Sequence, residues 1–308
     1  MTLQQLEYIV ALDKHKHFVT AAEHCFVTQP TLTIQVKKLE DEIGVILFDR
    51  KQNPLKTTTA GEQIILKARK ILAEVAGLKQ LVGHEKDNII GRFKIGVIPT
   101  IAPYLIPLFV SHFSEKYPNT ILEITELKSE DIIESLKKDS LDLGIIVTPI
   151  DEVYINEIPL YYEPFVFYGS QNHPLLKHKT VDKSDLQKEG DLWLLDKGNC
   201  FRNQVLNLCL TEEQKKSKSI YFNSSSIESV KRMVSYYNGF TLLPELSLNK
   251  NDINFRPIKE PVPVREVSIV YHNTFIKEGL IDALRQEILN IIPKHYKKND
   301  NFFRVKWR

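Results

Sequence analysis

Apolar residues change their spacing along this chain near residue 91, and the change separates two kinds of structure. Before that point they recur every three or four residues, as on one face of a helix. After it, the short apolar runs FKIGVIP, TILEITEL and LDLGIIV alternate with helical segments, which predicts an α/β region built on a parallel sheet. The chain is therefore expected to join a helical N-terminal region to a larger α/β region.

Length and composition are those of an ordinary globular protein. The 308 residues allow two or three compact units, and the apolar share of 43% can form sizeable cores. No run approaches the roughly 18 apolar residues of a membrane span, and the start MTLQQLEYIV lacks the charge and cleavage pattern of a signal peptide. These features predict a cytoplasmic protein that does not contact membranes.

Short helices joined by a tight turn are expected near the N-terminus. Apolar spacing predicts helices over 2–12 and 18–25, then a tight corner, and a third helix that begins at Thr28 and ends at Gly44. Thr28 is a good N-cap, and Pro30 is tolerated in the first turn of a helix. The pattern is typical of a helix-turn-helix, in which the second helix of the motif enters the major groove of DNA.

Polar residues of this last helix and of the segment behind it are candidates for DNA contacts. We expect base-edge or phosphate contacts from the start of the helix, and phosphate contacts from its lysines and from a two-stranded wing within DRKQNPLKTTTAG. The candidates are Thr28, Gln29, Pro30, Thr31, Thr33, Gln35, Lys37, Lys38, Arg50, Lys51 and Lys56. Over residues 1–58, seven basic side chains balance seven acidic ones, so charge alone does not indicate DNA binding.

One long helix is expected from Thr59 to about His84. Its apolar stripe consists of Ile64, Ala68, Ile71, Leu72, Val75, Leu78, Leu81 and Val82. Because an apolar stripe on an exposed connecting helix needs a partner, we interpret this segment as a dimerisation helix. The alternative is that the stripe packs only against its own domain.

Two hydroxyl residues stand where predicted strands of the α/β region end and helices begin. Thr100 and Ser129 occupy the edge at which such sheets bind ligands, although either could serve only as a helix cap. A second α/β unit is expected from Phe165, with strands FVFYG, LWLLD, SIYFN and FTLLP and with Gly239 as a left-handed helix cap. Two such units with crossing connections resemble a periplasmic solute-binding fold, whose cleft takes a small ligand.

Two of the three cysteines, Cys200 and Cys209, lie nine residues apart in GNCFRNQVLNLC. In a helix that rises about 1.5 Å per residue, their Cα atoms would stand about 13 Å apart, whereas a disulfide needs about 7 Å or less. A bond between them therefore requires the helix to unwind. Arg202 and the start of the helix are expected to lower the pKa of Cys200. The alternative is that both cysteines are buried apolar residues without a redox role.

The third cysteine and the N-terminal histidines are not expected to form a site. Cys25 occupies an apolar position of the N-terminal helices and is interpreted as core packing. His15, His17 and His24 have no metal-ligand spacing with the cysteines. Neither a metal site nor another cofactor is therefore expected.

These segments together carry a resemblance to a known family. The stretch FVTAAEHCFVTQPTLTIQVKKLEDEIGVILFDR, followed by TTTAG, resembles the winged helix-turn-helix of LysR-type transcriptional regulators, and the order of parts agrees over nearly the whole chain. GNCFRNQVLNLC, with IGVIPTIAPYLIP before it and GFTLLP after it, is similar to the peroxide-sensing members of that family. The resemblance implies a DNA-binding transcriptional regulator, mainly an activator of oxidative-stress genes, and not an enzyme.

The resemblance also implies roles for individual residues. Cys200 would attack hydrogen peroxide as a thiolate, and Cys209 would convert the resulting sulfenic acid into a reversible disulfide. Arg202 would stabilise the thiolate. The residues implied to form the peroxide pocket are Thr100, Ser129, Asn199, Arg202 and Arg265. Asn199 departs from the histidine often found at its position, and Ser129 stands where threonine is common.

The organisation of the chain and its partners follow from the same resemblance. The expected parts are a winged helix-turn-helix domain (1–58), a linker or dimerisation helix with a hinge (59–91), a first regulatory subdomain (92–164 with 266–293), a second regulatory subdomain (165–265) and a basic, solvated C-terminal tail (294–308). Expected partners are double-stranded promoter DNA, hydrogen peroxide, further copies of the chain in a dimer or homotetramer, RNA polymerase, and a thiol reductant such as glutaredoxin or thioredoxin.

Two other functions stay open. A LysR-type regulator could bind a small metabolite in its regulatory cleft, with the cysteines as structural residues. Replacing Cys200 with serine would then leave the response intact. A thiol peroxidase would also use a reactive cysteine, but a chain that gives residues 1–91 to a winged helix and a dimerisation helix argues against one.

Overall fold

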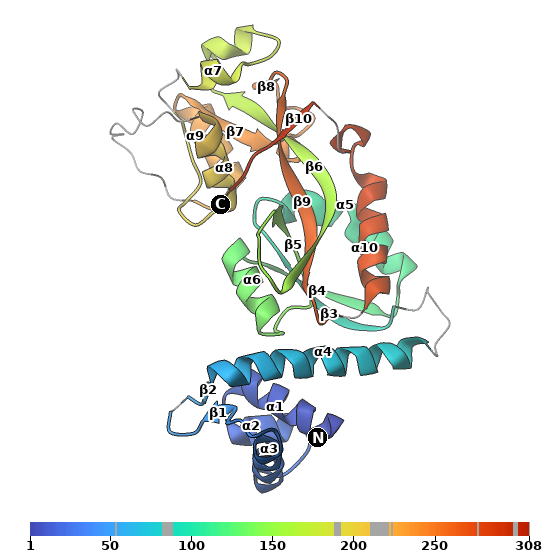
Figure 1. The fold of residues 1–308 in the computed structure, drawn as a ribbon. Helices are drawn as coiled ribbons and strands as arrows, with labels where there is room; N and C mark the ends of the chain where they lie inside the picture. The colour runs from blue at the N-terminus through green and yellow to red at the C-terminus, as the bar shows by residue number, and fades with distance from the viewer. Residues whose placement is uncertain are drawn as a thin grey trace. The chain divides into compact units, whose positions relative to one another are not determined.

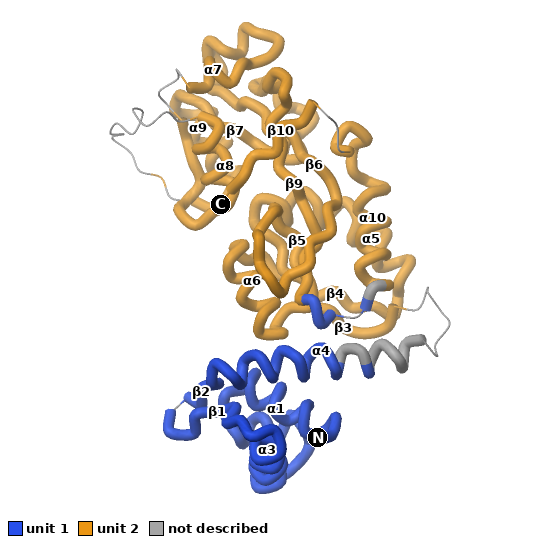
Figure 2. The backbone as a smooth tube through the Cα atoms, viewed as in Figure 1, with its two compact units in different colours: residues 1–87, 273–278 blue, residues 88–272, 279–308 orange. Residues whose placement is uncertain are grey.

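The protein forms two compact units, shown in blue and orange in Figure 2. The structure is a computed structural model that describes the chain apart from residues 53, 82–88, 188–191, 210–221, 223, 276, 298–300 and 308. One unit contains residues 1–87 with 273–278, and the other contains residues 88–272 with 279–308. No helix among the described residues has both the length and the apolar composition needed to cross a membrane.

The first unit is helical, as expected. Its elements in chain order are α1 (Leu3–His15), α2 (Phe18–His24), α3 (Gln29–Ile43), β1 (Phe48–Asp49), β2 (Lys56–Thr57) and α4 (Thr59–Leu81) (Figure 1). The Thr28 side chain accepts a hydrogen bond from the backbone of Thr31 and caps α3, which ends at Gly44 with φ +70°. The wing is confirmed as a short antiparallel pair of β1 and β2.

A tight turn connects α2 to α3, as the helix-turn-helix pattern predicts. Phe26 adopts φ +55° and leaves its side chain 96% exposed, and the next backbone N–H, of Val27, donates back to Ala22. Leu32, Val36 and other apolar side chains of α3 pack against α1 and α2 in one buried core. This core holds α3 with its opposite face toward solvent.

The first half of α4 packs on its own unit. Ile65 and Ala68 are fully buried in the core of the helices, whereas Ile71 is 41% exposed. The predicted stripe had included Ile64 rather than Ile65 as its first member. Its later members include Leu78, whose side chain lies outside the described residues. Dimerisation through α4 therefore stays a prediction.

The second unit is a mixed α/β structure (Figure 1). Its elements in chain order are β3 (Gly91–Val97), α5 (Ala102–Lys116), β4 (Thr120–Glu126), α6 (Ser129–Lys137), β5 (Leu143–Thr148), β6 (Ile155–Gly169), η1 (Pro174–Lys177), α7 (Lys183–Leu186), α8 (Cys200–Cys209), α9 (Ile227–Tyr236), β7 (Phe240–Pro244), η3 (Glu245–Ser247), β8 (Phe255–Pro257), β9 (Val262–His272), α10 (Glu278–Ile291), η4 (Lys294–Tyr296) and β10 (Phe302–Arg304).

The sheet has the strand order β4-β3-β5-β9-β6-β7, with β10 beside β9 and β8 beside β6. Among the described strands, β3, β4 and β5 form the parallel sheet that the alternation predicts, and β10 pairs in parallel with β9. The strands β9, β6, β7 and β8 join by antiparallel pairs. The long strands β6 and β9 run without a break across the expected limits of the two regulatory subdomains, at 164/165 and 265/266. The limits of the parts therefore stay a prediction.

Some predictions for the second half of this unit need correction. The apolar stretch LWLLD is not a strand: only Leu192 forms an isolated bridge, to Phe240, because the chain turns away toward α8 within a few residues. Gly239 has φ +96° but does not cap α9, which ends at Tyr236 and is followed by a turn into β7. The strand predicted in SIYFN lies outside the described residues, apart from Phe222.

The C-terminal residues are not the solvated tail that their charge suggested. β10 pairs in parallel with β9, and Arg304 forms an ion pair with Glu266 at 2.9 Å. Val305 and Trp307 are almost fully buried. Their apolar side chains lie between the basic residues, so the segment binds to its own unit while several of its charges remain in water.

Candidate redox site and DNA-binding surface

The helix α8 begins at Cys200 and ends at Cys209, as the spacing argument assumed. Gly198 has φ +86°, and the Asn199 side chain accepts a hydrogen bond from Phe201 N at 3.0 Å. Asn199 therefore caps the helix, which is a structural role that the sequence analysis did not assign to it. Both thiols are free. The ends of a ten-residue helix are about 13 Å apart, too far for a disulfide without unwinding.

Cys200 belongs to a cluster of buried polar residues that includes several of the predicted ones. Cys200 itself is 4% exposed, Ser129 is 4% exposed and Thr100 is fully buried. Ser129 Oγ forms no hydrogen bond of ordinary geometry, although it lies near enough to the Cys200 thiol to lower its pKa. A buried hydroxyl beside a thiol, with no bond of its own, can receive or donate a hydrogen bond to a small polar ligand.

Arg265 is the buried cation of this cluster. Its Nη1 and Nη2 donate to the hydroxyl and the carbonyl oxygen of Thr100, both at 3.0 Å. Its guanidinium also lies over the ring of Phe201, 5.5 Å from the centroid. Ser129 from the start of α6 and Arg265 from β9 thus act on the Cys200 thiol. Thr100, in the loop after β3, is bound to Arg265, and Asn199 directly precedes Cys200.

Glu163 is the buried partner of Arg265 in this cluster, and the sequence analysis did not identify it. This fully buried carboxylate accepts from Arg265 Nε at 2.8 Å and from Leu246 N at 2.9 Å, and lies 2.7 Å from Arg265 Nη2. Burial raises its pKa, against the opposing influence of the Arg265 charge. The signal available in the sequence was an acidic residue directly before the apolar strand run PFVFYG, because a charge there needs a buried partner.

Arg202 does not have the predicted position beside the thiol. Its Nη1 donates to the carbonyl oxygen of Leu195 at 2.6 Å and so ties α8 to the segment before it. The guanidinium that lowers the pKa of Cys200 is that of Arg265, which comes from a strand far along the chain. Sequence proximity had favoured Arg202, but a side chain two residues along a helix points to a different face.

Burial has the largest influence on Cys200 and raises the pKa of its thiol above the ordinary value. The Ser129 hydroxyl, the Arg265 charge and the backbone N–H groups at the start of α8 all lower this pKa. The start of the helix lowers the pKa of Cys200, as expected. The prediction that this pKa lies below its ordinary value is wrong, because exclusion of water destabilises the thiolate more than these groups stabilise it.

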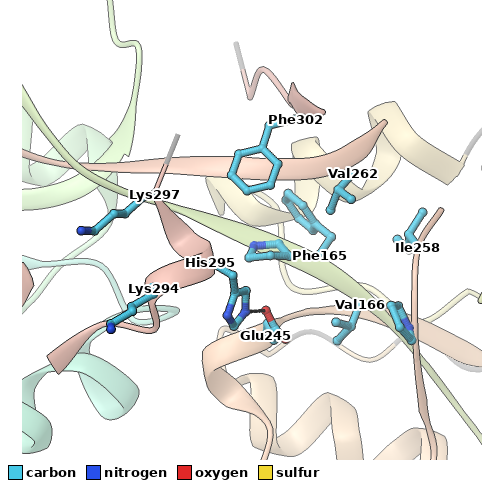
Figure 3. A pocket seen from close by; sticks show the side chains of 11 residues that line it. Phe165, Val166, Glu245, Ile258, Val262, Lys294, His295, Lys297 and Phe302 are labelled. Carbon is cyan, nitrogen blue, oxygen red and sulfur yellow. Dashed lines mark hydrogen bonds and ion pairs between the residues drawn. The ribbon is translucent and has the colours of Figure 1, made fainter. Parts of the chain in front are cut away.

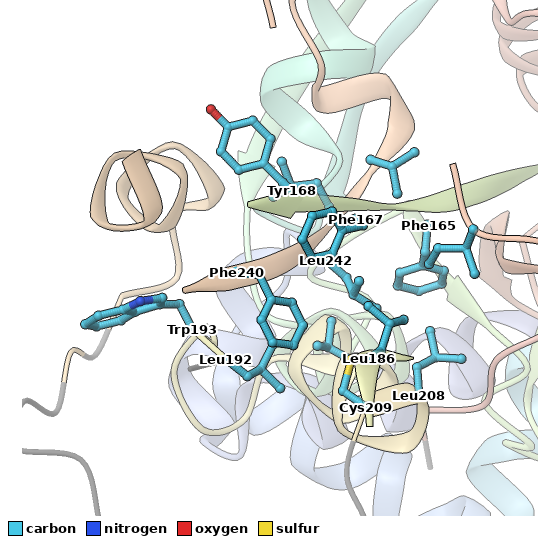
Figure 4. Packing of buried hydrophobic residues seen from close by; sticks show 14 of the residues in the cluster. Phe165, Phe167, Tyr168, Leu186, Leu192, Trp193, Leu208, Cys209, Phe240 and Leu242 are labelled. Carbon is cyan, nitrogen blue, oxygen red and sulfur yellow. The ribbon is translucent and has the colours of Figure 1, made fainter. Parts of the chain in front are cut away.

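Cys209 lies at the opposite end of α8 in apolar surroundings. It is 1% exposed and belongs to the buried cluster that includes Leu186, Leu192 and Leu208 (Figure 4). Burial raises the pKa of its thiol to about 12, and the opposing influence of Lys183 is smaller. In this conformation Cys209 is a core residue, and its thiolate is strongly disfavoured.

Most of the predicted DNA-contacting side chains are exposed. The exposed ones are Thr28, Gln29, Pro30, Thr31, Lys37, Lys38, Arg50, Lys51 and Lys56. Thr33 is half-buried and donates to the carbonyl of Gln29 at 2.9 Å, and Gln35 is half-buried and accepts from Gln5 at 3.2 Å. Ile34, which the sequence analysis passed over, is 54% exposed on the same helix. An apolar side chain there can contact a thymine methyl group.

Arg50 has a structural contact with α3, outside the wing. Its Nη2 lies 2.6 Å from the carboxylate of Glu40, which is itself nearly buried and accepts from the backbone of Leu47 at 2.8 Å. Its guanidinium also lies 5.7 Å from the centroid of the Phe18 ring. Any phosphate contact by Arg50 has to compete with this ion pair, whereas Lys51 and Lys56 are exposed on the wing.

A hollow lies elsewhere in the α/β unit. It has a volume of about 600 Å³ and is lined by apolar side chains of β6, β8 and β9 and by basic ones of η4 (Figure 3). His295 and Glu245 form a hydrogen bond of 3.0 Å at its edge. Neither Cys200 nor Cys209 lines it. Phe165 does, and its ring stacks on that of Phe201 in α8 at 5.3 Å.

No cluster suited to a metal ion occurs among the residues that the structure describes. The rings of His15 and His24 lie 4.9 Å apart, without a third ligand beside them. Cys25 is half-buried against the core of the first unit, and burial raises its pKa. Its packing agrees with the expectation of a core residue.

Comparison with known proteins identifies the family. The lysR-family model of bacterial regulatory helix-turn-helix proteins matches residues 3–62, and the LysR substrate binding domain matches residues 86–290. A hydrogen peroxide-inducible genes activator from Haemophilus influenzae is 34% identical over 276 residues, which cover 88% of this chain and 90% of that protein.

Solved structures give the same result. Full-length OxyR from Pseudomonas aeruginosa, with a cysteine replaced by aspartate, is 34% identical with a TM-score of 0.75, over 95% of this chain and 99% of that one. A cysteine-to-serine mutant of Corynebacterium glutamicum OxyR with bound hydrogen peroxide is 25% identical with a TM-score of 0.60, over 94% of this chain and 92% of that one. This chain belongs to the LysR family of DNA-binding transcriptional regulators and is not an enzyme.

Proposed function

We propose that this protein is a transcriptional activator that senses hydrogen peroxide through a reversible disulfide between Cys200 and Cys209. The observation that carries the proposal is the buried constellation of Thr100, Ser129 and Arg265 around the thiol of Cys200. Hydrogen peroxide is a small, neutral molecule that both donates and accepts hydrogen bonds, so it suits a cluster of buried polar side chains. The similar proteins named as peroxide-inducible activators support the same function.

In the first step, the Cys200 thiolate sulfur attacks one oxygen of the peroxide. The O–O bond breaks, Cys200 becomes a sulfenic acid, and the second oxygen leaves as hydroxide, which takes up the thiol proton to form water. Arg265 and the hydroxyls of Thr100 and Ser129 hold the peroxide and stabilise the negative charge that develops on the leaving oxygen. Because the thiolate is disfavoured in the resting pocket, only a small fraction of chains is ready to react at any moment.

In the second step, the Cys209 thiolate attacks the sulfur of the sulfenic acid. The S–O bond breaks and a second water molecule leaves, so two thiols and one peroxide give one disulfide and two molecules of water. The helix α8 has to unwind for this step, because its ends are too far apart. The conformational change follows from the bond, since the disulfide is compatible with only one of the two forms.

DNA binding and assembly complete the proposed function. Residues 28–38 of the helix-turn-helix and the lysines of the wing bind the major groove and the phosphates of a promoter operator. Self-association through α4 gives a dimer, and two dimers form a homotetramer whose arrangement on DNA changes with the redox state. RNA polymerase responds to that change, and a thiol reductant of the glutaredoxin or thioredoxin type restores both thiols.

The function can be tested with DNA selected by the protein itself. Duplexes are selected from a random-sequence pool by the reduced full-length chain, and their protection against DNase is compared before and after one equivalent of hydrogen peroxide. We expect the protected region to change length on oxidation and to return with thioredoxin. The Cys200→Ser variant should bind the same duplexes and keep the reduced pattern with peroxide present.

The same experiment decides between peroxide and a metabolite as the signal. A regulator that responds to a metabolite would show no change in protection with peroxide, in either the unaltered chain or the Cys200→Ser variant. That outcome would contradict the proposal. It would direct attention to the cavity of about 600 Å³ beside η4.

A further inference from the structure

The C-terminal segment, here residues 302–307, lies along α8, where Figure 1 marks the C-terminus. Three amide side chains of the helix donate to three successive carbonyl oxygens of the segment. The bonds are Gln204 Nε2 to Val305 O at 2.7 Å, Asn207 Nδ2 to Lys306 O at 2.9 Å and Asn203 Nδ2 to Trp307 O at 3.1 Å. The helix that carries both sensor cysteines is therefore bound along one face to a distant part of the chain.

The other half of the C-terminal segment is attached to the sheet. β10 pairs with β9, Val305 N donates to Val264 O at 2.9 Å, and Arg304 forms its ion pair with Glu266. Residues 302–304 are thus held by β9 and Glu266. Residues 305–307 depend on α8 for the hydrogen bonds to their carbonyl oxygens.

Apolar packing adds to these hydrogen bonds. Val305 belongs to the same buried cluster as Val205, Leu208 and Cys209, and is 2% exposed. Trp307 is 6% exposed. The C-terminal segment therefore covers part of the apolar surroundings that keep the Cys209 end of α8 in place.

We propose that the C-terminal segment stabilises α8 in its helical, reduced form, and that the disulfide between Cys200 and Cys209 releases residues 305–307. The inference rests on the proposed disulfide switch. Asn203 and Asn207 lie four residues apart on one face of α8, about 6 Å along its axis. Unwinding the helix enough to join its ends removes that common face, so the three hydrogen bonds cannot all persist.

Contacts made only in the reduced form favour that form by their own free energy. The C-terminal segment therefore sets how readily the sensor oxidises, and it changes from docked to undocked when the sensor does. Lys306 is an exposed basic residue of this segment, so undocking also moves positive charge. The segment in this way influences the thiol–disulfide equilibrium and also changes its own conformation when the disulfide forms.

Tryptophan fluorescence can follow the release directly. The chain has two tryptophans, so a full-length Trp193→Phe variant reports on Trp307 alone. We expect blue-shifted emission that is protected from acrylamide in the reduced protein. One equivalent of hydrogen peroxide should cause a red shift and an increase in quenching, and dithiothreitol should reverse both. A Trp193→Phe, Cys209→Ser variant should show neither change.

Disulfide mapping of the same samples separates the two proposals. If the Cys200 to Cys209 bond forms while the emission of Trp307 stays unchanged, the inference about the C-terminal segment is wrong and the sensor function stands. If no such bond forms, the proposed function fails as well. A red shift that appears together with the bond supports both.

A second variant tests the stabilising role without truncating the chain. Asn203→Ala with Asn207→Ala removes two of the three donors and should shift the thiol–disulfide equilibrium toward the disulfide about tenfold, or about 30 mV toward a more negative midpoint potential. Alanine favours helix more than asparagine does, so the substitutions by themselves oppose this result. Asn301→Ala is the control, because that side chain donates to Glu260. An unchanged equilibrium in the double variant contradicts the proposal.

Discussion

The two ends of α8 carry the same functional group in opposite surroundings. Cys200 lies among a hydroxyl, a guanidinium and the first backbone N–H groups of the helix, whereas Cys209 lies among leucines. Both thiols are buried and both have raised pKa values, but only the pKa of Cys200 is opposed by several nearby groups. The N-terminal end is arranged for reaction with a polar molecule, and the C-terminal end is arranged for stability.

This difference explains how one helix can be stable in the reduced form and still respond to oxidation. A cysteine in an apolar core contributes to stability as a small hydrophobic residue, so Cys209 helps keep the reduced helix folded until its partner has reacted. Once Cys200 is a sulfenic acid, the free energy of forming a disulfide becomes available to offset the loss of this packing. The polar end thus receives the signal, and the apolar end sets how much free energy the response must supply.

Replacing each cysteine in turn gives the largest expected effects. Cys200→Ser should abolish reaction with peroxide, because no nucleophile remains in the polar pocket. Cys209→Ser should still form a sulfenic acid at Cys200, which dimedone labelling and mass spectrometry detect, but no intramolecular disulfide. Cys25→Ser is the matched control and should behave as the unaltered chain. Labelling of Cys200→Ser at Cys209 would show that the two ends do not differ in the way described.

Removing the buried carboxylate should weaken the polar end selectively. Glu163→Gln leaves the Arg265 charge buried without its partner, so unfolding in urea should show a loss of about 3 kcal/mol or more. Oxidation of Cys200 should also slow, because Arg265 is no longer held against Thr100. Glu123→Gln is the control, since its ion pair with Arg92 is exposed and surface pairs contribute about 0–1 kcal/mol. Equal effects of the two substitutions would contradict the role given to Glu163.

Comparing serine at the two positions measures the difference in polarity directly. At position 209 a hydroxyl enters an apolar cluster, and an unsatisfied buried hydroxyl costs about 1–3 kcal/mol. At position 200 the same hydroxyl meets Ser129 and the start of α8, so the cost should be smaller. Urea unfolding of the two reduced variants provides the comparison. If the Cys200→Ser variant is less stable than Cys209→Ser, the claim that the Cys200 end of α8 is the more polar one is contradicted.

The pH dependence of oxidation follows from the raised pKa of Cys200. Because only the thiolate attacks peroxide, the rate should rise about tenfold per pH unit through the neutral range and should not level off below the pKa of about 8.5 of a free cysteine. Stopped-flow measurements of the oxidation rate between about pH 6 and 9, at peroxide concentrations that differ by about tenfold, test this prediction. A plateau near pH 6 would show that the pKa is lowered in the reactive form.

The sequence alone predicted elements where local pattern determines structure. The helix-turn-helix, the long helix α4 and the helix between the cysteines follow from apolar spacing and from caps such as Thr28. It did not predict that LWLLD is irregular, because an apolar run does not specify its pairing partner. The docking of residues 305–307 on α8 depends on contacts across about one hundred residues of chain, which no local pattern contains.

The candidate site shows the same limit. Cys200, Thr100 and Ser129 could be identified from their places at the ends of strands and helices. Arg202 was chosen as the thiolate partner because it is close in sequence, whereas the side chains that act on Cys200, those of Ser129 and Arg265, come from elsewhere in the fold. Glu163 was missed because its function depends on pairing with Arg265, on a strand that follows it by about one hundred residues.

Peptide mapping of the oxidised protein tests the central claim most directly. The reduced full-length chain is treated with one equivalent of hydrogen peroxide, quenched with an alkylating reagent at short intervals and digested for mass spectrometry. The account predicts a disulfide between Cys200 and Cys209 that forms within seconds, while Cys25 stays free, and no such bond in Cys200→Ser. Two free thiols after this treatment, or a bond that involves Cys25 instead, would contradict it.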